Sequence, residues 1–209
     1  MSEYKFTQDW FSWAPAVWEQ LIPLLPERKK FLEIGSFEGR SATWIIENML
    51  DNEAVSGSVL CIDTWEGGEE HNNGEMSGAE ERFKHNVGVA QAKYWKRTGN
   101  LDAYSIVDTF KGKSDLALAH IRAVDERYWD EFDFIYIDGS HVAKDVLTDA
   151  CMAWPLLKKQ GIMVFDDYMW GEPRDILHRP KPAIDAFVNI FAEEVDMVHM
   201  GYQLIVRKK

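Results

Sequence analysis

Short apolar runs alternate along the chain with longer segments in which apolar residues recur at helical spacing. Polar and turn residues bound the short runs, which is typical of buried strands, whereas the longer segments are typical of amphipathic helices. The predicted strands are Phe31–Ile34, Val59–Asp63, Tyr104–Asp108, Phe132–Asp138, Ile162–Asp167, Val195–His199 and Tyr202–Arg207. The predicted helices are Arg40–Leu50, 78–97, Ser114–Val124, Ala143–Leu157 and Pro182–Ala192.

This alternation predicts an α/β fold. Strands that alternate with helices form a mostly parallel sheet with helices on both faces. Gly201 lies between the last two strands and indicates a tight turn, so one strand near the C-terminus is expected to run antiparallel. We therefore expect a Rossmann-like three-layer α/β/α sandwich around a mostly parallel seven-stranded sheet.

The N-terminal part of the chain is rich in aromatic residues. Residues 8–25 are predicted to form an amphipathic helix or a pair of helices, with Pro15 near a start and Pro26 near an end. We expect a helical segment over residues 1–30 that packs over the sheet or its ligand cleft. Residues 31–209 are predicted to be one domain.

The chain is acidic, with a net charge of −12 over 209 residues. Nucleic-acid binding needs clustered Lys and Arg, so neither nucleic acid nor an anionic membrane is an expected partner. There is no apolar run long enough to span a membrane, and Met1–Trp10 lacks the pattern of a secretory signal. We expect a small-molecule substrate and a cytoplasmic location, and the pattern leaves a homo-oligomer open. Cys61 and Cys151 are predicted to be buried, reduced thiols.

A glycine turn joins the first predicted strand to the first helix. Gly35 and Gly39 permit a tight turn and close approach of the backbone to a ligand. The fuller Gly-x-Gly-x-x-Gly pattern of dinucleotide sites is absent. Asp63 ends the second strand, where an acidic side chain accepts hydrogen bonds from ribose hydroxyls in folds of this kind. Residues 64–77 and 168–181 are loops at the same edge of the sheet and are candidates for substrate contacts or lids.

Carboxylates follow two further strands. Asp138 ends the fourth strand, and Asp166 and Asp167 end the fifth, so parallel strands bring them to one edge. Carboxylates that share a cleft repel each other unless a cation joins them, and oxygen ligands suit Mg²⁺. The alternative interpretation is that some of them cap helices or turns. His141 follows Asp138 closely and is a candidate general base, because histidine titrates near neutrality.

These motifs resemble those of class I S-adenosylmethionine-dependent methyltransferases. Glu33-Ile34-Gly35-Ser36-Phe37-Glu38-Gly39-Arg40-Ser41 resembles their first motif, and the run from Gly112 to Asp115 resembles the adenine-edge segment of catechol O-methyltransferase-like enzymes. The aspartates with His141 are closer still to macrocin-type O-methyltransferases; in the catechol enzymes an Asn stands where Asp167 is. The resemblance implies a cofactor site formed by Glu33, Gly35, Ser36, Phe37, Gly39, Ser41, Asp63, Thr64, Trp65, Ser114 and Asp138, with Trp65 against the adenine face.

The leading hypothesis is Mg²⁺-assisted O-methylation of a small hydroxylated molecule with S-adenosylmethionine (SAM) as cofactor. The resemblance implies Asp138, Asp166 and Asp167 as metal ligands, and Asp138 and His141 as catalytic residues. Three alternatives stay open: a metal-free methyltransferase, an NAD-dependent oxidoreductase, which the missing glycine disfavours, and a non-catalytic cofactor-binding protein.

Overall fold

A seven-stranded sheet forms the centre of the computed structural model, which describes residues 3–51, 58–68, 74, 76–99, 105–124, 131–171 and 175–209. The strand order is β3-β2-β1-β4-β5-β7-β6, and β7 runs antiparallel to both β5 and β6. This confirms the predicted fold class. The strands are β1 Lys30–Ile34, β2 Ser58–Asp63, β3 Val107–Lys111, β4 Phe132–Ile137, β5 Leu157–Phe165, β6 Val195–Met200 and β7 Leu204–Lys208.

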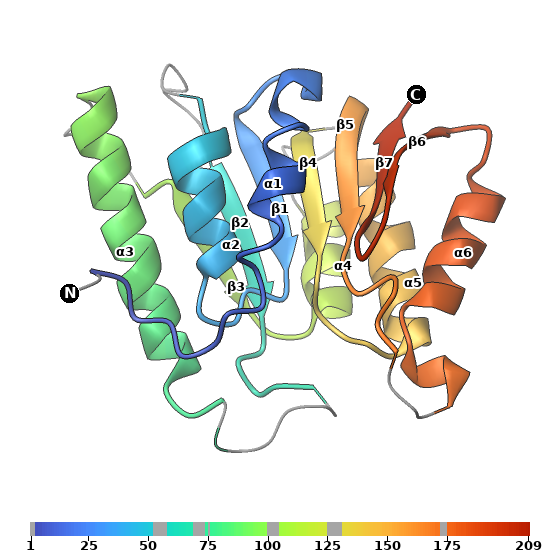
Figure 1. The fold of residues 1–209 in the computed structure, drawn as a ribbon, viewed down its shortest axis with the longest axis horizontal. Coiled ribbons are helices and arrows are strands. Elements are labelled where there is room, and N and C mark those ends of the chain that lie inside the picture. Colours follow the sequence, from blue (N-terminus) through green and yellow to red (C-terminus); the bar gives the residue numbers. More distant parts are fainter. Residues whose placement is uncertain are drawn as a thin grey trace.

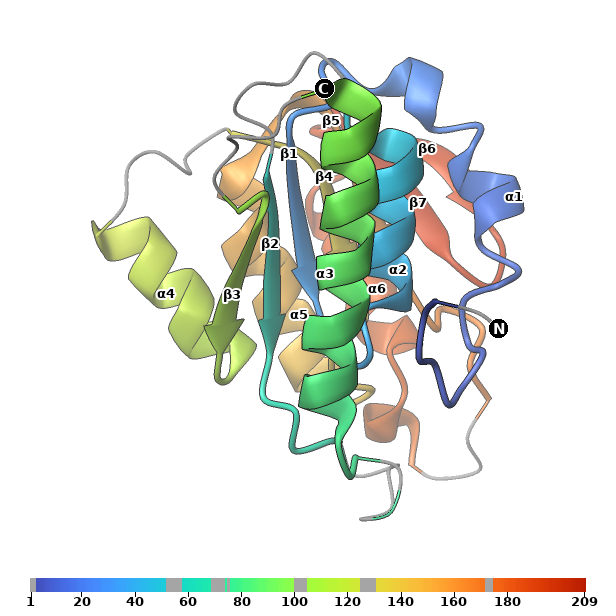
Figure 2. The same ribbon diagram turned by 90° about the vertical axis from the view of Figure 1, so that its left-hand side faces the viewer.

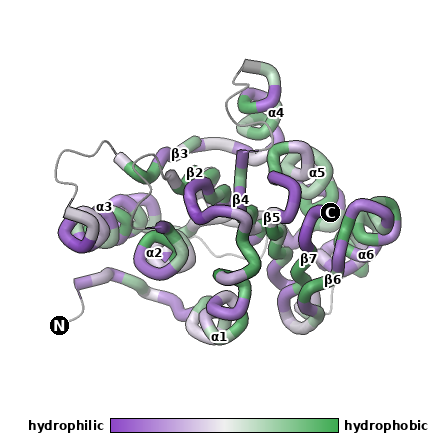
Figure 3. The backbone as a smooth tube through the Cα atoms, turned by 90° about the horizontal axis from the view of Figure 1, so that it is seen from above, coloured by the Kyte–Doolittle hydropathy of each residue, from purple (hydrophilic) through white to green (hydrophobic). Residues whose placement is uncertain are grey.

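Helices cover both faces of the sheet (Figures 1 and 2). Seen from above, α1, α2 and α3 lie on one side, and α4, α5 and α6 lie on the other (Figure 3). The helices are α1 Pro15–Trp18, α2 Arg40–Trp44 with a π-helical continuation Ile45–Met49, α3 Ala79–Thr98, α4 Ser114–Val124, α5 Ala143–Ala153 and α6 Lys181–Ile190. Among the described residues, none of the helices is both long and apolar enough to cross a membrane.

Two apolar cores fill the space between the sheet and its helices. Successive side chains of a strand point to opposite faces, so each buried strand contributes to both cores. Phe134 and Tyr136 of β4 join the core beneath α2 and α3, whereas Ile135 and Ile137 join the core beneath α4 and α5. This burial on both faces explains why the strand reads as a continuous apolar run.

The N-terminal segment contains less helix than expected. Only Pro15–Trp18 is α-helical, and Ile22–Leu24 forms one 3-10 turn. Pro23 and Pro26 interrupt a longer helix because proline lacks an amide donor. The segment is held instead by Trp18, which is fully buried and packs edge-on against Tyr136 at 4.8 Å.

Two smaller expectations need correction. The third strand begins at Val107, later than predicted, and Tyr104 lies outside the described residues. This strand is at the edge of the sheet and is mostly exposed, so its apolar signal is weak. Cys61 is buried in β2 as predicted, but Cys151 is exposed because its position on α5 faces away from the sheet.

Candidate active site

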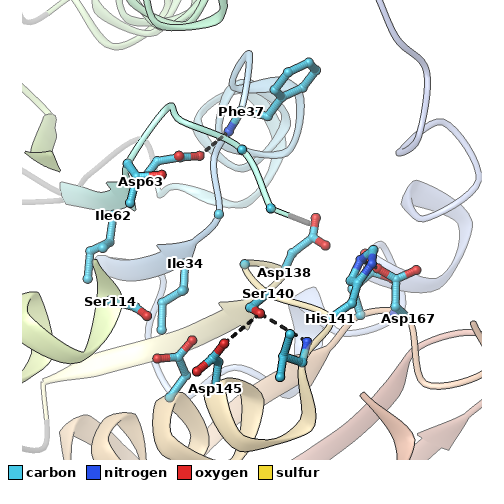
Figure 4. A pocket seen from close by; sticks show the side chains of 18 of the residues that line it. Ile34, Phe37, Ile62, Asp63, Ser114, Asp138, Ser140, His141, Asp145 and Asp167 are labelled. Atoms are coloured by element: carbon cyan, nitrogen blue, oxygen red, sulfur yellow. Dashed lines mark hydrogen bonds and ion pairs between the residues drawn. The ribbon is translucent and has the colours of Figure 1, made fainter. Parts of the chain in front are cut away.

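A cleft of about 1250 Å³ lies at the carboxyl ends of the parallel strands. Ligands bind at this edge in open α/β sheets, and the volume exceeds that of a single drug-sized ligand. Figure 4 shows side chains that line it, with Asp63 and Ser114 toward one end and His141 and Asp167 toward the other. The predicted site residues on its wall are Gly35, Phe37, Asp63, Thr64, Ser114, Asp138, His141, Asp166 and Asp167.

The glycine turn after β1 forms the floor of the cleft. Gly35 has a φ of +85°, and a Cβ there would stand 2.0 Å from the carbonyl oxygen of Asp138. Only glycine permits this approach of β1 to the end of β4. Gly39 also has a positive φ and lies directly before α2. Its backbone packs closely against the Phe83 side chain. The predicted turn is therefore present, and the close backbone contact at Gly35 requires glycine there.

Asp63 fastens this turn to the end of β2. Its Oδ2 accepts hydrogen bonds from the backbone amides of Ser36 at 2.8 Å and Phe37 at 2.7 Å (Figure 4). Its Oδ1 accepts one from the Trp65 amide at 2.6 Å. A carboxylate has about four lone-pair positions, so the side chain retains acceptor capacity toward the cleft. Thr64 lies beside it on the wall.

Five predicted cofactor residues are absent from the wall of the main cleft: Glu33, Ser36, Gly39, Ser41 and Trp65. Glu33 is fully buried beneath the turn, where its carboxyl group accepts a hydrogen bond from the Ser41 hydroxyl and contacts Cys61 Sγ at 3.6 Å. Burial raises the pKa of Glu33 to about 7. Ser41 and Ser36 line a small hollow that adjoins the cleft at Gly35. Glu33 therefore supports the glycine turn from below and does not face the cleft.

Trp65 differs from its predicted place at the adenine face. Its φ of +54° turns the side chain back into the core, where the indole packs on Phe83 at 5.1 Å. The indole nitrogen donates a hydrogen bond to the Phe37 carbonyl at 2.8 Å. The Trp65 side chain therefore braces the glycine turn from below and is absent from the cleft wall.

A tyrosine links two of the three predicted metal-binding carboxylates. The Tyr136 hydroxyl contacts Asp138 Oδ2 at 2.9 Å and also contacts Asp166 Oδ2. Gln203 donates a further hydrogen bond to Asp166 at 3.1 Å. Burial, with the charges of Asp166 and Asp167, raises the pKa of Asp138 well above its ordinary value, and burial raises that of Asp166 to about 6.

The third carboxylate pairs with the predicted base. His141 Nε2 lies 2.7 Å from Asp167 Oδ2 (Figure 4). The Tyr202 hydroxyl donates to Asp167 Oδ1 at 2.8 Å. The Trp170 ring lies against the imidazole with a centroid distance of 4.3 Å. The imidazole is therefore oriented by a carboxylate on one side and by an aromatic ring on the other.

The carboxylates do not form a metal shell as arranged in this structure. Within the described residues, no three His, Cys, Asp or Glu side chains converge in a way that could hold a metal ion. Asp166 accepts hydrogen bonds from Tyr136 and Gln203. Asp167 pairs with His141 and accepts a hydrogen bond from Tyr202. A cation would have to displace these protein donors. As arranged, the donor set is therefore a hydrogen-bonded network.

Several residues of the cleft and of the adjoining small hollow were missed from the sequence. Tyr136 precedes Asp138 by two positions on β4, and strand alternation was a usable signal for placing both on one face. Trp10 and Trp13 reach the cleft from the N-terminal segment, and Tyr202 reaches it from the turn before β7. No local pattern marks Tyr202, whereas Trp10 and Trp13 belong to the aromatic segment 8–25 that was expected to pack over the sheet or its ligand cleft. The loops 64–77 and 168–181 contribute Gly67, Gly68 and Trp170 to the wall, although residues 69–73, 75 and 172–174 lie outside the described part.

The strand order, the antiparallel β7 and the position of the cleft define a class I SAM-dependent methyltransferase fold. Residues 32–168 match the family model described as a methyltransferase domain. Since this match covers more than half of the chain, the chain belongs to that family.

Individual relatives are distant. An uncharacterized protein of Acanthamoeba polyphaga mimivirus is 26% identical over 139 residues, which are 66% of this chain and 51% of that protein. The chain thus spans about half the length of the curated relative that it matches. An O-methyltransferase from Bacillus cereus in complex with SAH has a TM-score of 0.60 at 18% identity, over 98% of this chain and 84% of that chain. TomG, an O-methyltransferase from Streptomyces achromogenes in complex with SAM, has a TM-score of 0.59 at 18% identity, over 94% and 79%. Both share the fold.

Proposed function

We propose that this protein transfers a methyl group from SAM to a hydroxyl of a small ring-shaped molecule. The observation that carries the proposal is the oriented His141–Asp167 pair in the same cleft as the glycine turn and Asp63. A hydroxyl becomes a better nucleophile when a positioned base takes its proton. The structural neighbours from Bacillus cereus and Streptomyces achromogenes are O-methyltransferases, which supports this reaction class.

The chain offers a separate place for each part of the cofactor. The backbone of the turn, Gly35 with Ser36, Phe37 and Gly39, would surround the methionine part. Asp63 and Thr64 would meet the ribose, and Ser114 at the start of α4 would meet the adenine. When bound, SAM would supply an electrophilic methyl group.

His141 is the proposed general base. Asp167 holds the imidazole at 2.7 Å, which orients the ring and stabilises its protonated form. With Nε2–H donating to Asp167, the nitrogen without a hydrogen is Nδ1; that nitrogen would take the hydroxyl proton as the oxygen takes the methyl group and SAH leaves. Asp138 would complete the wall beside the reacting oxygen.

The cleft wall also restricts the shape and the charge of the acceptor molecule that can bind. Trp10 stacks on Phe37 at 5.0 Å, and Trp13 packs edge-on against Tyr202 at 5.2 Å, so flat aromatic surfaces face the space near His141. Among the described lining residues, eight are Asp and two are Lys. We infer that the acceptor is a hydroxylated ring that is neutral or cationic, because an anion would be repelled.

A second candidate is Mg²⁺-assisted transfer. It is favoured by the charges of Asp166 and Asp167 that raise the pKa of Asp138, since a divalent cation would relieve this repulsion. The hydrogen bonds from Tyr136, Gln203 and Tyr202 argue against it. Full turnover in excess chelator would exclude this candidate. A Mg²⁺ heat in calorimetry that disappears in Asp166→Ala would support it.

The main test combines binding and turnover. Calorimetry with S-adenosylhomocysteine (SAH) should show one site, and NAD should not bind. SAH release from SAM should then be measured over a panel of catechols, amino sugars and hydroxylated carboxylic acids, with the acids expected to be unreactive. His141→Ala should lower kcat by about 10²- to 10⁴-fold and leave SAH affinity unchanged. His120→Ala, on the exposed side of α4, is the matched control. Absence of SAH binding would refute the proposal, and full turnover by His141→Ala would refute the base.

A further inference from the structure

Glu38 is a buried carboxyl group in the glycine turn that the proposed chemistry leaves unused. The residue is 1% exposed, and its carboxyl group meets three donors. The backbone amide of Thr7 donates to Oε2 and the Thr7 hydroxyl donates to Oε1, both at 2.6 Å. Arg82 of α3 forms an ion pair with the same group. Glu38 thus joins α3 to residues 5–13, which we call the N-terminal strap.

Two further contacts hold the first half of the strap. Asn86 of α3 is fully buried and accepts from the Lys5 amide at 2.7 Å, while its Nδ2 donates to the Lys5 carbonyl at 3.0 Å. The same Nδ2 donates to the backbone carbonyl of Glu38 at 2.9 Å. Arg40 of α2 donates to the Gln8 carbonyl at 3.0 Å. The strap is therefore fixed where it passes α3 and α2 on its way to α1 (Figure 1).

The second half of the strap forms one side of the cleft. Trp10 stacks on Phe37 at 5.0 Å, and Trp13 packs edge-on against Tyr202 at 5.2 Å. The Trp13 indole nitrogen donates to the Trp10 carbonyl at 2.9 Å, which fixes one ring relative to the other residue. Both side chains line the cleft, yet Trp10 is 50% exposed and Trp13 is 38% exposed. Aromatic surface is therefore left for a ligand to cover.

Tyr202 relates this aromatic surface to the proposed base. Its ring contacts Trp13, and its hydroxyl donates to Asp167, which pairs with His141. In Figure 4, His141 and Asp167 lie at the end of the cleft away from Ser114. Trp13 therefore borders the part of the cleft in which the acceptor would bind.

We propose that Glu38 positions the acceptor-binding wall: by holding Thr7, it keeps the strap in place so that Trp10 and Trp13 pack on the ring of the acceptor. This inference rests on the proposed function, because it takes the acceptor to bind beside His141. Two aromatic side chains held in fixed positions favour a flat hydroxylated ring, since ring–ring contacts depend on geometry. Glu38 acts through the strap and is a positioning residue.

Trypsin digestion measures the attachment of the strap without any ligand. Trypsin cleaves after Lys5, whose amide and carbonyl are both hydrogen-bonded, so cleavage there requires the strap to open. Glu38→Gln replaces an acceptor oxygen with an amide group that faces the donors of Thr7 and Arg82. Mass spectrometry should show cleavage after Lys5 at least about fivefold faster than in the wild type.

Steady-state kinetics test the acceptor wall, with the catechol or amino sugar of the panel that reacts fastest. Glu38→Gln should raise the KM of that acceptor about three- to tenfold and leave kcat and SAH affinity near those of the wild type. Thr7→Val removes only the hydroxyl contact and should act in the same direction to a smaller extent. In a protein that carries Trp10→Ala and Trp13→Ala, adding Glu38→Gln should not change KM further, because the strap then has no ring to position.

The control variant is Glu80→Gln, which removes the same charge close to Arg82 on α3. Glu80 pairs with Lys84 and Lys111, so both assays should give wild-type values, and thermal melting checks that the variants fold. Wild-type cleavage after Lys5 or a wild-type KM in folded Glu38→Gln and Thr7→Val would overturn the inference. An undiminished effect of Glu38→Gln in the protein without the two rings would overturn it too. Absence of SAH binding to the wild type would instead overturn the proposed function, and the trypsin rates would still decide whether Glu38 holds the strap.

Discussion

The Glu33→Gln substitution should make the protein more stable at alkaline pH. Glu33 is fully buried beneath the glycine turn, and burial raises its pKa from 4.5 to about 7. The folded protein therefore holds a proton that the unfolded chain releases between those two values. Such a group favours folding below pH 4.5, and this contribution is lost as the pH rises through 7.

The size of the expected stability difference follows from the raised pKa of Glu33. A difference of about 2.5 pKa units corresponds to roughly 3 kcal/mol, and the whole of it acts on the wild type above pH 7. Glutamine removes the ionisation and keeps an oxygen that accepts from the Ser41 hydroxyl. The variant should be close to the wild type at pH 5 and more stable by up to about 3 kcal/mol at pH 8.

Urea unfolding followed by tryptophan fluorescence, at intervals from pH 5 to 8, measures the difference between the two proteins. Asp149 and Asp166 titrate in the same window, but they are present in both proteins and cancel in the difference. A difference that does not grow with pH, or that grows in favour of the wild type, would refute the reasoning. Glu33 lies outside the cleft, so SAH affinity at pH 7 should be unchanged.

Two further predictions concern the scaffold of the cleft. Gly35→Ala should destabilise the fold by several kcal/mol and abolish SAH binding, because the added Cβ would stand 2.0 Å from the Asp138 carbonyl oxygen. Gly88→Ala on α3 is the control, where nothing lies within 4 Å and thermal melting should show a gain of up to about 1 kcal/mol. Trp18→Phe should lose about 1–3 kcal/mol, since the buried indole nitrogen donates to Gln203 Oε1 at 2.8 Å, and wild-type stability in urea unfolding would contradict this.

The local pattern of the chain was enough to predict most of the framework. Apolar runs and helical periodicity depend on near neighbours, so the order and type of the strands and helices from residue 31 onward and the antiparallel β7 were predicted correctly. The third strand begins later than predicted and the fifth begins earlier. The same reasoning brought Asp138, Asp166, Asp167 and His141 to one edge, because the ends of parallel strands meet there. The glycine turn was identified for the same reason, since its two glycines are local requirements of the backbone.

The partners of these side chains depended on contacts between distant parts of the chain. Gln203 follows Trp18 by 185 positions, yet the two side chains form a hydrogen bond and place the amide beside Asp166. Trp65 was expected at the cofactor, but its backbone conformation turns it onto Phe83. The prolines shortened the N-terminal helix, and packing on the sheet carried Trp10 and Trp13 to the cleft. Periodicity indicates which face of an element is buried. Which donor meets which carboxylate is decided only when elements far apart in the chain pack together. The hydrogen bonds of the three aspartates could therefore be found only in the folded structure.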